Sequence, residues 1–233
     1  MTESSSPVPE LESTPKQAAI IETATLLSLG IAVLSLFLFA WIAESVSHEQ
    51  TKNFDLAVRM RIHGYASPNV TKTMIAISFL GGDGLTVAAI VAAVVFVYFR
   101  WLRATLWLVV TILGAMVLDV SLKYAFHRTR PTPFFGPLPH SYSFPSGHAL
   151  FSFCFYGVLA GLLAGRTRSQ LARILIWTLA AVLVTAIGLS RIYLGVHYPS
   201  DVIAGYLAAT LWVTALISLD RMRIRRRSLK QTA

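Results

Sequence analysis

The sequence predicts an all-α integral membrane protein whose body is a bundle of six transmembrane helices. The composition supports this fold class, because 55% of the 233 residues are hydrophobic and only 13% are charged, whereas a typical soluble domain carries about 25% charged residues. Six apolar stretches also approach or exceed the roughly 20 residues that a helix needs to cross a bilayer. In approximate bounds they cover residues 23–43, 74–99, 104–126, 148–164, 171–189 and 202–219.

These stretches define a membrane domain, predicted over residues 21–220, and two tails. Residues 1–20 are rich in Ser, Pro and Glu, a composition typical of a disordered segment. We expect no cleaved signal peptide there, because Lys16 is the only basic residue before an apolar run that is itself too long for one. Residues 221–233 form a strongly basic tail.

The distribution of Lys and Arg predicts that both termini are cytoplasmic. With the N-terminus placed inside, the inner tails and loops contain 1, 2, 3 and 6 of these residues, or 12 of the 20 in the chain. Cytoplasmic segments of membrane proteins carry this excess, and the basic C-terminal tail suits the anionic inner leaflet. Topology therefore explains the net charge of +9. We expect no nucleic-acid binding, because no recognition fold or aromatic platform accompanies the tail.

Residues 44–73 would then lie outside the membrane, and they contain an amphipathic pattern. Phe54, Val58 and Ile62 recur at helical spacing with charged residues between them, which fits either a helix on the outer leaflet or a helix packed on the bundle. Elsewhere, small residues at a spacing of four favour close helix contacts within one bundle, with a homodimer as the weaker alternative. These residues are Gly157, Gly161, Gly165, Gly205 and Ala209.

Ionisable residues gather at three places near the predicted outer ends of the spans. Charged groups at membrane depth are costly and mark functional sites. Lys123 lies near the end of the third span and Arg130 follows that span. The segment Pro145-Ser146-Gly147-His148 opens the fourth span, and Arg191 and Asp201 flank the connection from the fifth span to the sixth. Three segments that are far apart in the sequence could therefore converge on one pocket at the outer interface.

The residue types in this pocket suit a tetrahedral oxyanion such as phosphate. Arg130 and Arg191 would offer planar forks for bidentate contacts, and Lys123 a point charge. The free backbone N–H groups and the dipole of the helix that begins near Gly147 would attract an anion, which the missing Cβ lets the backbone approach. The Ser146 hydroxyl could donate to the oxyanion or cap the helix.

Two histidines would turn this binding site into a reaction centre. His197 precedes Asp201 by four residues, close enough for the carboxylate to take the proton on one ring nitrogen and leave the other as a nucleophile. His148 could protonate the leaving oxygen and later activate water. No metal or other cofactor is needed, because the three cations offset the phosphate charge. The single cysteine, Cys154, excludes a cysteine-ligated metal site, and we expect a buried thiol there.

The combined pattern resembles the three-part signature of the type 2 phosphatidic acid phosphatase (PAP2) family, which shares its phosphate pocket with vanadium haloperoxidases. The parts are Lys123-x6-Arg130-Pro131, Pro145-Ser146-Gly147-His148 and Ser190-Arg191-x5-His197-x3-Asp201, all in order and with intact spacing. The resemblance runs from about Phe54 to Leu219. It implies a PAP2/haloperoxidase-like helical core and a metal-independent phosphatase.

Position by position, the resemblance implies that His197 is the nucleophile that becomes phosphohistidine, that Asp201 orients it, and that His148 is the acid and base. Phosphate would be bound by Lys123, Arg130, Ser146, Gly147 and Arg191. Six-span bacterial members act at the outer face of the cytoplasmic membrane on lipid phosphates that include phosphatidylglycerophosphate, phosphatidate and undecaprenyl diphosphate, and the signature does not choose among them. The alternative is a protein that binds or transports phosphorylated lipids without hydrolysing them.

For several other residues the sequence supports only a general prediction. Asp119 lies one helical turn before Lys123 and is expected to pair with it. Arg128 either contacts a phosphate or headgroup or is an ordinary surface residue. The Gly-Gly-Asp-Gly run at 81–84 is expected to start a helix or to permit close packing. Three histidines are expected on the surface, namely His48, His63 and His140.

Overall fold

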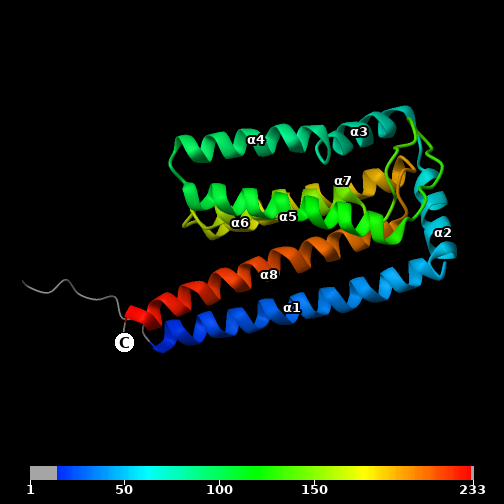
Figure 1. Cartoon of the computed structure of the whole chain (residues 1–233). Helices are drawn as coiled ribbons and strands as arrows, with labels where there is room; N and C mark the ends of the chain where they lie inside the picture. The colour runs from blue at the N-terminus through cyan, green and yellow to red at the C-terminus, as the bar shows by residue number, and fades with distance from the viewer. Residues whose placement is uncertain (1–14, 232–233) are drawn as a thin grey trace, which may run out of the picture.

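The computed structural model describes residues 15–231, with side chains described for residues 22–223, and its regular structure over that range is entirely helical. This confirms the predicted all-α fold. Figure 1 shows an elongated bundle whose long helices run roughly side by side. The helices are α1 (Pro15–Ser47), α2 (Lys52–His63), α3 (Pro68–Phe79), α4 (Asp83–Tyr98), α5 (Leu102–Phe126), α6 (Gly147–Ala164), α7 (Gln170–Tyr193) and α8 (Pro199–Gln231). Helix α1 thus begins inside the segment predicted as a tail, whose residues 1–14 lie outside the described part.

Six spans long and apolar enough to cross a membrane occur in the described part of the chain, as the sequence predicts. They are α1, α5, α6, α7, α8 and the α3–α4 pair, which together cover Pro68–Tyr98. Large aliphatic side chains cover their outward faces, and Leu27, Val94 and Leu179 are each more than 60% exposed. Because a water-soluble surface rarely carries apolar patches of this extent, these faces contact lipid, and the protein is a multi-pass membrane protein.

The second span differs from its prediction in two ways. It begins at Pro68, because Ser67 caps it by accepting a hydrogen bond from the backbone N–H of Val70. It is also interrupted between α3 and α4, where the chain approaches its neighbours closely. A Cβ added to Gly81 would lie 2.4 Å from Cγ2 of Ile187. The glycine-rich run therefore serves both expected purposes, since it permits close packing and precedes the start of α4.

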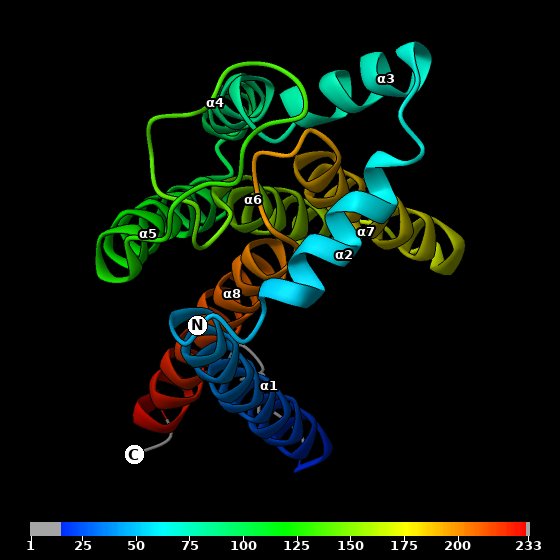
Figure 2. The same ribbon diagram turned by 90° about the vertical axis from the view of Figure 1, so that its right-hand side faces the viewer.

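Helix α6 is the central element of the bundle. Half of its residues are buried, compared with a third or less in the other spans. Figure 2 views the bundle from the end that carries α2 and shows α6 surrounded by α5, α7 and α8, with α4 on its remaining side. Cys154 lies on α6 and is buried, as expected. The side chains at the N-terminus of α6 are therefore enclosed by helices on several sides.

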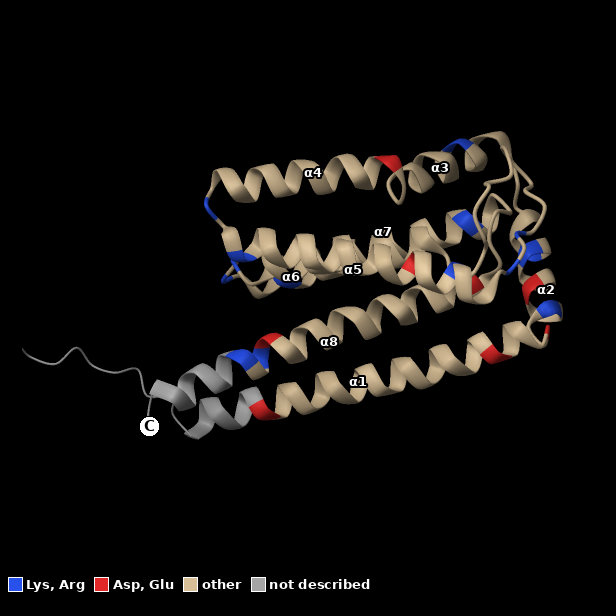
Figure 3. Cartoon of the chain, in the orientation of Figure 1, with Lys and Arg blue, Asp and Glu red and all other residues tan. Residues whose placement is uncertain are grey.

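The two ends of the bundle carry different structures. The described chain begins in α1 and ends in α8 at one end, where α1 packs along α8 and Ser28 hydrogen-bonds Ser218 over 3.1 Å (Figure 1). Helix α2 and the loop between α5 and α6 cover the other end. Most charged residues lie at these two ends, and the middle of the bundle is almost free of them (Figure 3). This is the distribution that a membrane-spanning bundle requires.

Helix α2 packs across the bundle through an unexpected face. Its buried residues are Asp55 and Arg59, whereas Phe54 and Met60 are at least half exposed. Ile62 alone of the predicted apolar stripe packs into the bundle core around Tyr193. Helix α2 therefore packs on the bundle, with polar side chains making much of the contact, and contact of its exposed apolar residues with the outer leaflet stays a prediction.

The small residues predicted to mark close helix contacts divide into two groups. A Cβ on Gly205 of α8 would lie 2.6 Å from the backbone oxygen of Ser146 and 2.9 Å from Cβ of Ala149, so α8 and α6 approach each other closely there. On Gly157, the nearest neighbour would be Cδ1 of Phe153 at 4.0 Å, which is ordinary contact. Gly205 is thus required by the packing beneath the α6 N-terminus, and Gly157 is not.

We predict that Gly205→Ala lowers the free energy of unfolding by about 1–3 kcal/mol, because overpacking forces backbones apart. Gly157→Ala is the matched control, and it should be neutral or slightly stabilising because alanine is the better helix former. Thermal unfolding of both variants in detergent measures the difference. Equal melting temperatures would contradict the close α6–α8 contact.

Candidate active site

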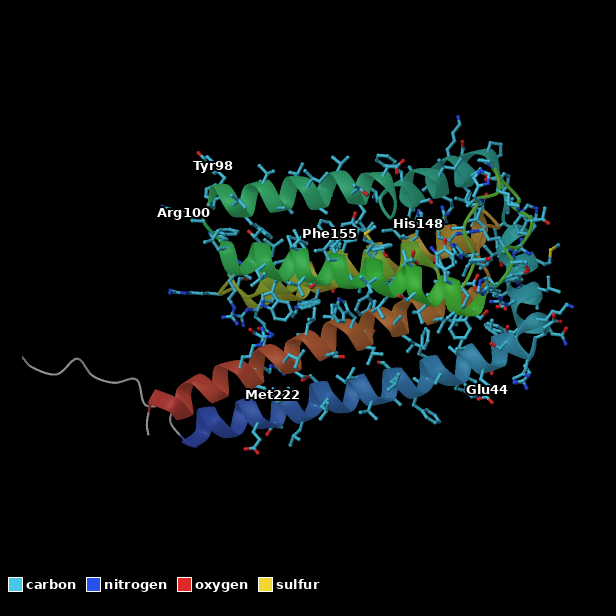
Figure 4. All side chains as sticks on the ribbon, in the orientation of Figure 1. Glu44, Tyr98, Arg100, His148, Phe155 and Met222 are labelled. Atoms are coloured by element: carbon cyan, nitrogen blue, oxygen red, sulfur yellow. The ribbon has the colours of Figure 1, made fainter. Side chains whose placement is uncertain are left out.

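The predicted site residues come together at the end of the bundle that carries α2. Figure 4 labels His148 at this end, in the layer next to the α3–α4 span. A Cβ on Gly82 would lie 3.0 Å from Nε2 of His148, so the interruption of the second span faces this histidine. The charges of nearby cations act on His148 from three directions. They belong to Lys123 in the last turn of α5, Arg130 in the following loop and Arg191 in the last turn of α7.

His197 is held with a defined proton position. Its Nε2 lies 2.9 Å from Nη1 of Arg130, and because a guanidinium can only donate, Nε2 must accept. The proton therefore resides on Nδ1, which faces Oδ2 of Asp201 at 3.4 Å. Burial lowers the pKa of His197 to about 4, although its hydrogen bond with Asp201 raises it. At neutral pH the ring is uncharged, with its lone pair on Nε2.

Asp201 is completely buried and is held by several donors. Its oxygens accept hydrogen bonds from the Ser143 hydroxyl, from the backbone N–H of Tyr198 at 2.9 Å and from Nη1 of Arg128 at 2.6 Å. These donors come from the α5–α6 loop and from the turn before α8. The carboxylate that faces His197 is therefore fixed in position and kept ionised.

The N-terminus of α6 forms an anion-attracting space beside Ser146, Gly147 and Lys123, which we call the cationic cradle. The Ser146 backbone N–H donates to the Asp201 carbonyl over 2.9 Å, which ties this terminus to the first turn of α8. A Cβ on Gly147 would lie 3.3 Å from Nζ of Lys123 and 2.9 Å from Oδ1 of Asp119, so glycine leaves room beside both groups. Lys123 and Asp119 form the expected ion pair at 2.8 Å.

Three buried polar atoms around this cradle have no hydrogen-bond partner within the described residues. They are Oγ of Ser146, Nε of Arg191 and Oδ1 of Asp119. Buried polar groups are normally paired, so such atoms mark a place where a ligand can satisfy them. The first two atoms can donate to an oxyanion. Their position beside Lys123 and the α6 N-terminus is that of an anion site.

Arg130 has a fixed orientation between this cradle and His197. Its Nε donates to the Ser141 backbone oxygen over 2.6 Å and its Nη1 donates to the Val196 backbone oxygen over 2.9 Å. Burial lowers the pKa of Arg130, but a guanidinium remains charged at any pH at which the protein functions. The structure thus brings all eight predicted site residues together.

Arg128 is neither a surface residue nor part of the cradle. It lies on the Nδ1 side of His197, behind the ring as seen from the cradle. There its Nη1 donates to Asp201 and its Nη2 donates to Asp55 over 2.8 Å. Burial alone would lower the pKa of Arg128, but the two carboxylates outweigh this effect and the pKa is raised. Neither alternative from the sequence described this role, because nothing in the sequence showed that the Asp55 side of α2 is buried.

His63 is partly buried rather than on the surface as the sequence predicts. Its ring stacks on Phe134 with 3.9 Å between ring centroids. Arg59 fixes the same region by donating to the backbone oxygens of Thr132 and Gly195. His48 and His140 are exposed, as expected. Helix α2 therefore supports the α5–α6 loop and the turn that carries His197.

Helix α3 contributes a residue that the sequence did not indicate. The Ser78 hydroxyl accepts a hydrogen bond from Nη1 of Arg191 over 2.5 Å and is buried. A serine in an apolar span gives no sign of this contact. The nearby glycine run indicated only that the chain packs closely in this region.

Within the described residues, no three His, Cys, Asp or Glu side chains gather as metal ligands.

Comparison with known proteins identifies the family to which this chain belongs. The PAP2 superfamily model matches residues 104–225, more than half of the chain. The protein belongs to the PAP2 superfamily. It is 32% identical to phosphatidylglycerophosphatase B of Bacillus subtilis over 74% of this chain and 87% of that protein. It is 27% identical to an undecaprenyl-diphosphatase of Sulfolobus acidocaldarius over 82% of this chain and 87% of that one.

A solved structure supports the same assignment. The crystal structure of the transmembrane PAP2-type phosphatidylglycerolphosphate phosphatase of Bacillus subtilis superposes with a TM-score of 0.74 at 26% identity, covering 82% of this chain and 96% of that one. The PAP2 match begins at residue 104. The side chains of Asp55, Arg59 and Ser78 therefore support the PAP2 site from outside the matched region.

We predict that Ser78→Ala weakens inhibition by inorganic phosphate by roughly threefold to tenfold, because an uncharged hydrogen bond that orients a guanidinium contributes about 0.5–1.5 kcal/mol. Thr73→Ala, on the exposed side of the same helix, is the matched control and should not change the inhibition constant. Phosphate competition in a turnover assay measures both variants. Identical constants would show that Arg191 does not need Ser78.

Proposed function

We propose that the protein is a metal-independent lipid phosphate phosphatase that works through a phosphohistidine at His197. One observation carries the proposal. Arg130 contacts Nε2 of His197 while Asp201 faces Nδ1, so the ring is neutral, correctly protonated for attack and adjacent to a cationic cradle. A pure binding protein would need the cations but not an imidazole oriented from both sides.

The proposed reaction has two steps. In the first, the bound phosphate offsets the cations around His148, so that His148 enters the step protonated. Nε2 of His197 then attacks phosphorus, the bond from phosphorus to the leaving oxygen breaks, and His148 gives its proton to that oxygen. In the second, His148 takes a proton from water, whose oxygen attacks phosphorus and releases His197 and phosphate. Lys123, Arg130 and Arg191 offset the charge on the phosphate oxygens in both steps.

The substrate proposed for this site is a membrane lipid that bears a phosphomonoester or a diphosphate. The site lies at one end of the spanning helices, so a phosphate head can enter the cradle while the acyl or prenyl tail stays in the bilayer. Relatives named phosphatidylglycerophosphatase B and undecaprenyl-diphosphatase support both lipid classes. We further propose that the termini are cytoplasmic and that the site faces the outer side of the cytoplasmic membrane, as the loop charges indicate.

The deciding experiment measures phosphate release by the purified protein, in EDTA, from phosphatidate, phosphatidylglycerophosphate and undecaprenyl diphosphate. The wild-type protein should hydrolyse at least one of them, and His197→Ala should reduce the rate by at least a thousandfold because the nucleophile is lost. His140→Ala, an exposed histidine of the α5–α6 loop, should keep full activity. A wild-type protein that binds these lipids without releasing phosphate would instead favour a binder or transporter.

We predict that activity persists well below pH 6. His197 must be neutral to attack, and burial lowers its pKa to about 4. The rate should therefore fall on the acid side only as the pH approaches 4, where the ring becomes protonated. Because an unfolded histidine titrates near 6.5, this group also destabilises the fold as the pH falls from about 6.5 towards 4. A pH profile of kcat/KM with its acid limb near 6.5 would contradict the assignment.

A further inference from the structure

Asp55 is a buried carboxylate for which the proposed reaction has no role so far. It lies on α2, a helix with many exposed residues, yet its own exposure is 0%. Both of its oxygens are engaged. Oδ1 accepts from the backbone N–H of Ser200 over 3.0 Å, and Oδ2 accepts from the Ser200 hydroxyl over 2.7 Å and from Nη2 of Arg128 over 2.8 Å. A carboxylate is buried only where such partners compensate its desolvation.

Arg128 connects this carboxylate to the one that faces His197. One guanidinium nitrogen, Nη2, binds Asp55, and the other, Nη1, binds Asp201 and the Ser200 hydroxyl. The guanidinium carbon also lies 4.2 Å from the centre of the Tyr198 ring. The fork therefore has one orientation, and that orientation depends on Asp55 as much as on Asp201.

The charge balance of this group matters for the reaction. Asp55 and Asp201 contribute two negative charges and Arg128 one positive charge, so these three hydrogen-bonded groups have a net charge of −1. Arg59 on α2 also acts on both carboxylates through its charge, but among the described residues it forms no ion pair with either of them. When Nε2 bonds to phosphorus while Nδ1 keeps its proton, the imidazole ring becomes positively charged. An excess of negative charge behind the ring stabilises that state, and the buried surroundings strengthen the effect.

We propose that Asp55 is a positioning residue for the nucleophile, acting through Arg128 on Asp201 and His197. This inference rests on the proposed function of His197. Asp55 does not touch the substrate. It holds Arg128 so that Asp201 stays aligned with Nδ1, and it prevents Arg128 from neutralising Asp201 completely. The assignment adds α2, which lies outside the matched PAP2 region, to the machinery of the site.

Loss of the Asp55 charge should change the pH at which His197 becomes protonated. Removing one negative charge behind His197 disfavours its protonated form, so the acid limb of the kcat/KM profile should move to lower pH. Charged and titratable groups from every neighbouring element surround the His197–Asp201 pair. They are Asp55 and Arg59 on α2, Lys123 and Asp119 on α5, Arg128 and Arg130 in the loop, His148 on α6, Arg191 on α7, Tyr198 in the turn before α8, and Asp201 on α8.

The test compares Asp55→Asn with two further variants, using the best substrate from the lipid panel. For Asp55→Asn we expect kcat to fall roughly tenfold, while KM and inhibition by inorganic phosphate stay within about threefold, because the cradle lies on the other side of His197. The acid limb should move down by about half a pH unit or more. Glu49→Gln, which removes an exposed charge from the same end of the bundle, should leave all four quantities unchanged.

Ser200→Ala keeps the inference testable if Asp55→Asn does not fold. It removes the hydroxyl that joins Arg128 to Asp55 but no charge, so kcat should fall roughly twofold to fivefold with no movement of the acid limb. An unchanged kcat in Asp55→Asn, or in Ser200→Ala if the former does not fold, would overturn the inference, as would parallel changes in KM and phosphate inhibition. If His197→Ala is inactive and these variants are normal, only this inference fails. If His197→Ala remains active, the proposed function fails.

Discussion

The buried ion pair between Arg128 and Asp201 is the interaction on which the geometry of the site most depends. It joins the loop after α5 to the first turn of α8, and through Asp55 it also joins α2 to both. Breaking a buried ion pair leaves an uncompensated charge at a cost of about 3–5 kcal/mol. Arg128 therefore links three elements that are distant in sequence at the point where the orientation of His197 is decided.

The same arrangement separates the charges of the site into two groups. Lys123, Arg130 and Arg191 lie towards the cradle, whereas Asp55 and Asp201 lie behind His197 and are paired with Arg128. Because Arg128 binds these two carboxylates, it offsets part of their charge and limits how far they neutralise the cradle, although Asp201 still acts on Arg130. The cradle keeps its attraction for a phosphate, and His197, the proposed nucleophile, keeps negative charge on its Asp201 side. Asp119 is the exception, since it pairs with Lys123 inside the cradle.

The part of the chain before the matched PAP2 region completes the site. Arg59 and Asp55 on α2 hold the loop and the turn that carry Arg130 and His197, while α3 provides Ser78 to Arg191. The glycine interruption before α4 lets the chain approach His148. The PAP2 core thus supplies the groups proposed to react, and the preceding helices orient them and close one side of the site.

The sequence by itself determined the six spans and named the residues proposed here to react. Long apolar stretches can only cross a bilayer as helices, and the spacing of the three motifs indicated a phosphate site. Tertiary structure alone decided the roles of Asp55, Arg128, His63 and Ser78. Each role depends on which face of a helix or loop meets its neighbours, and polar residues that pack inward have the same sequence pattern as polar residues that face water. Their burial follows from contacts between segments more than 70 residues apart, which local sequence patterns do not record.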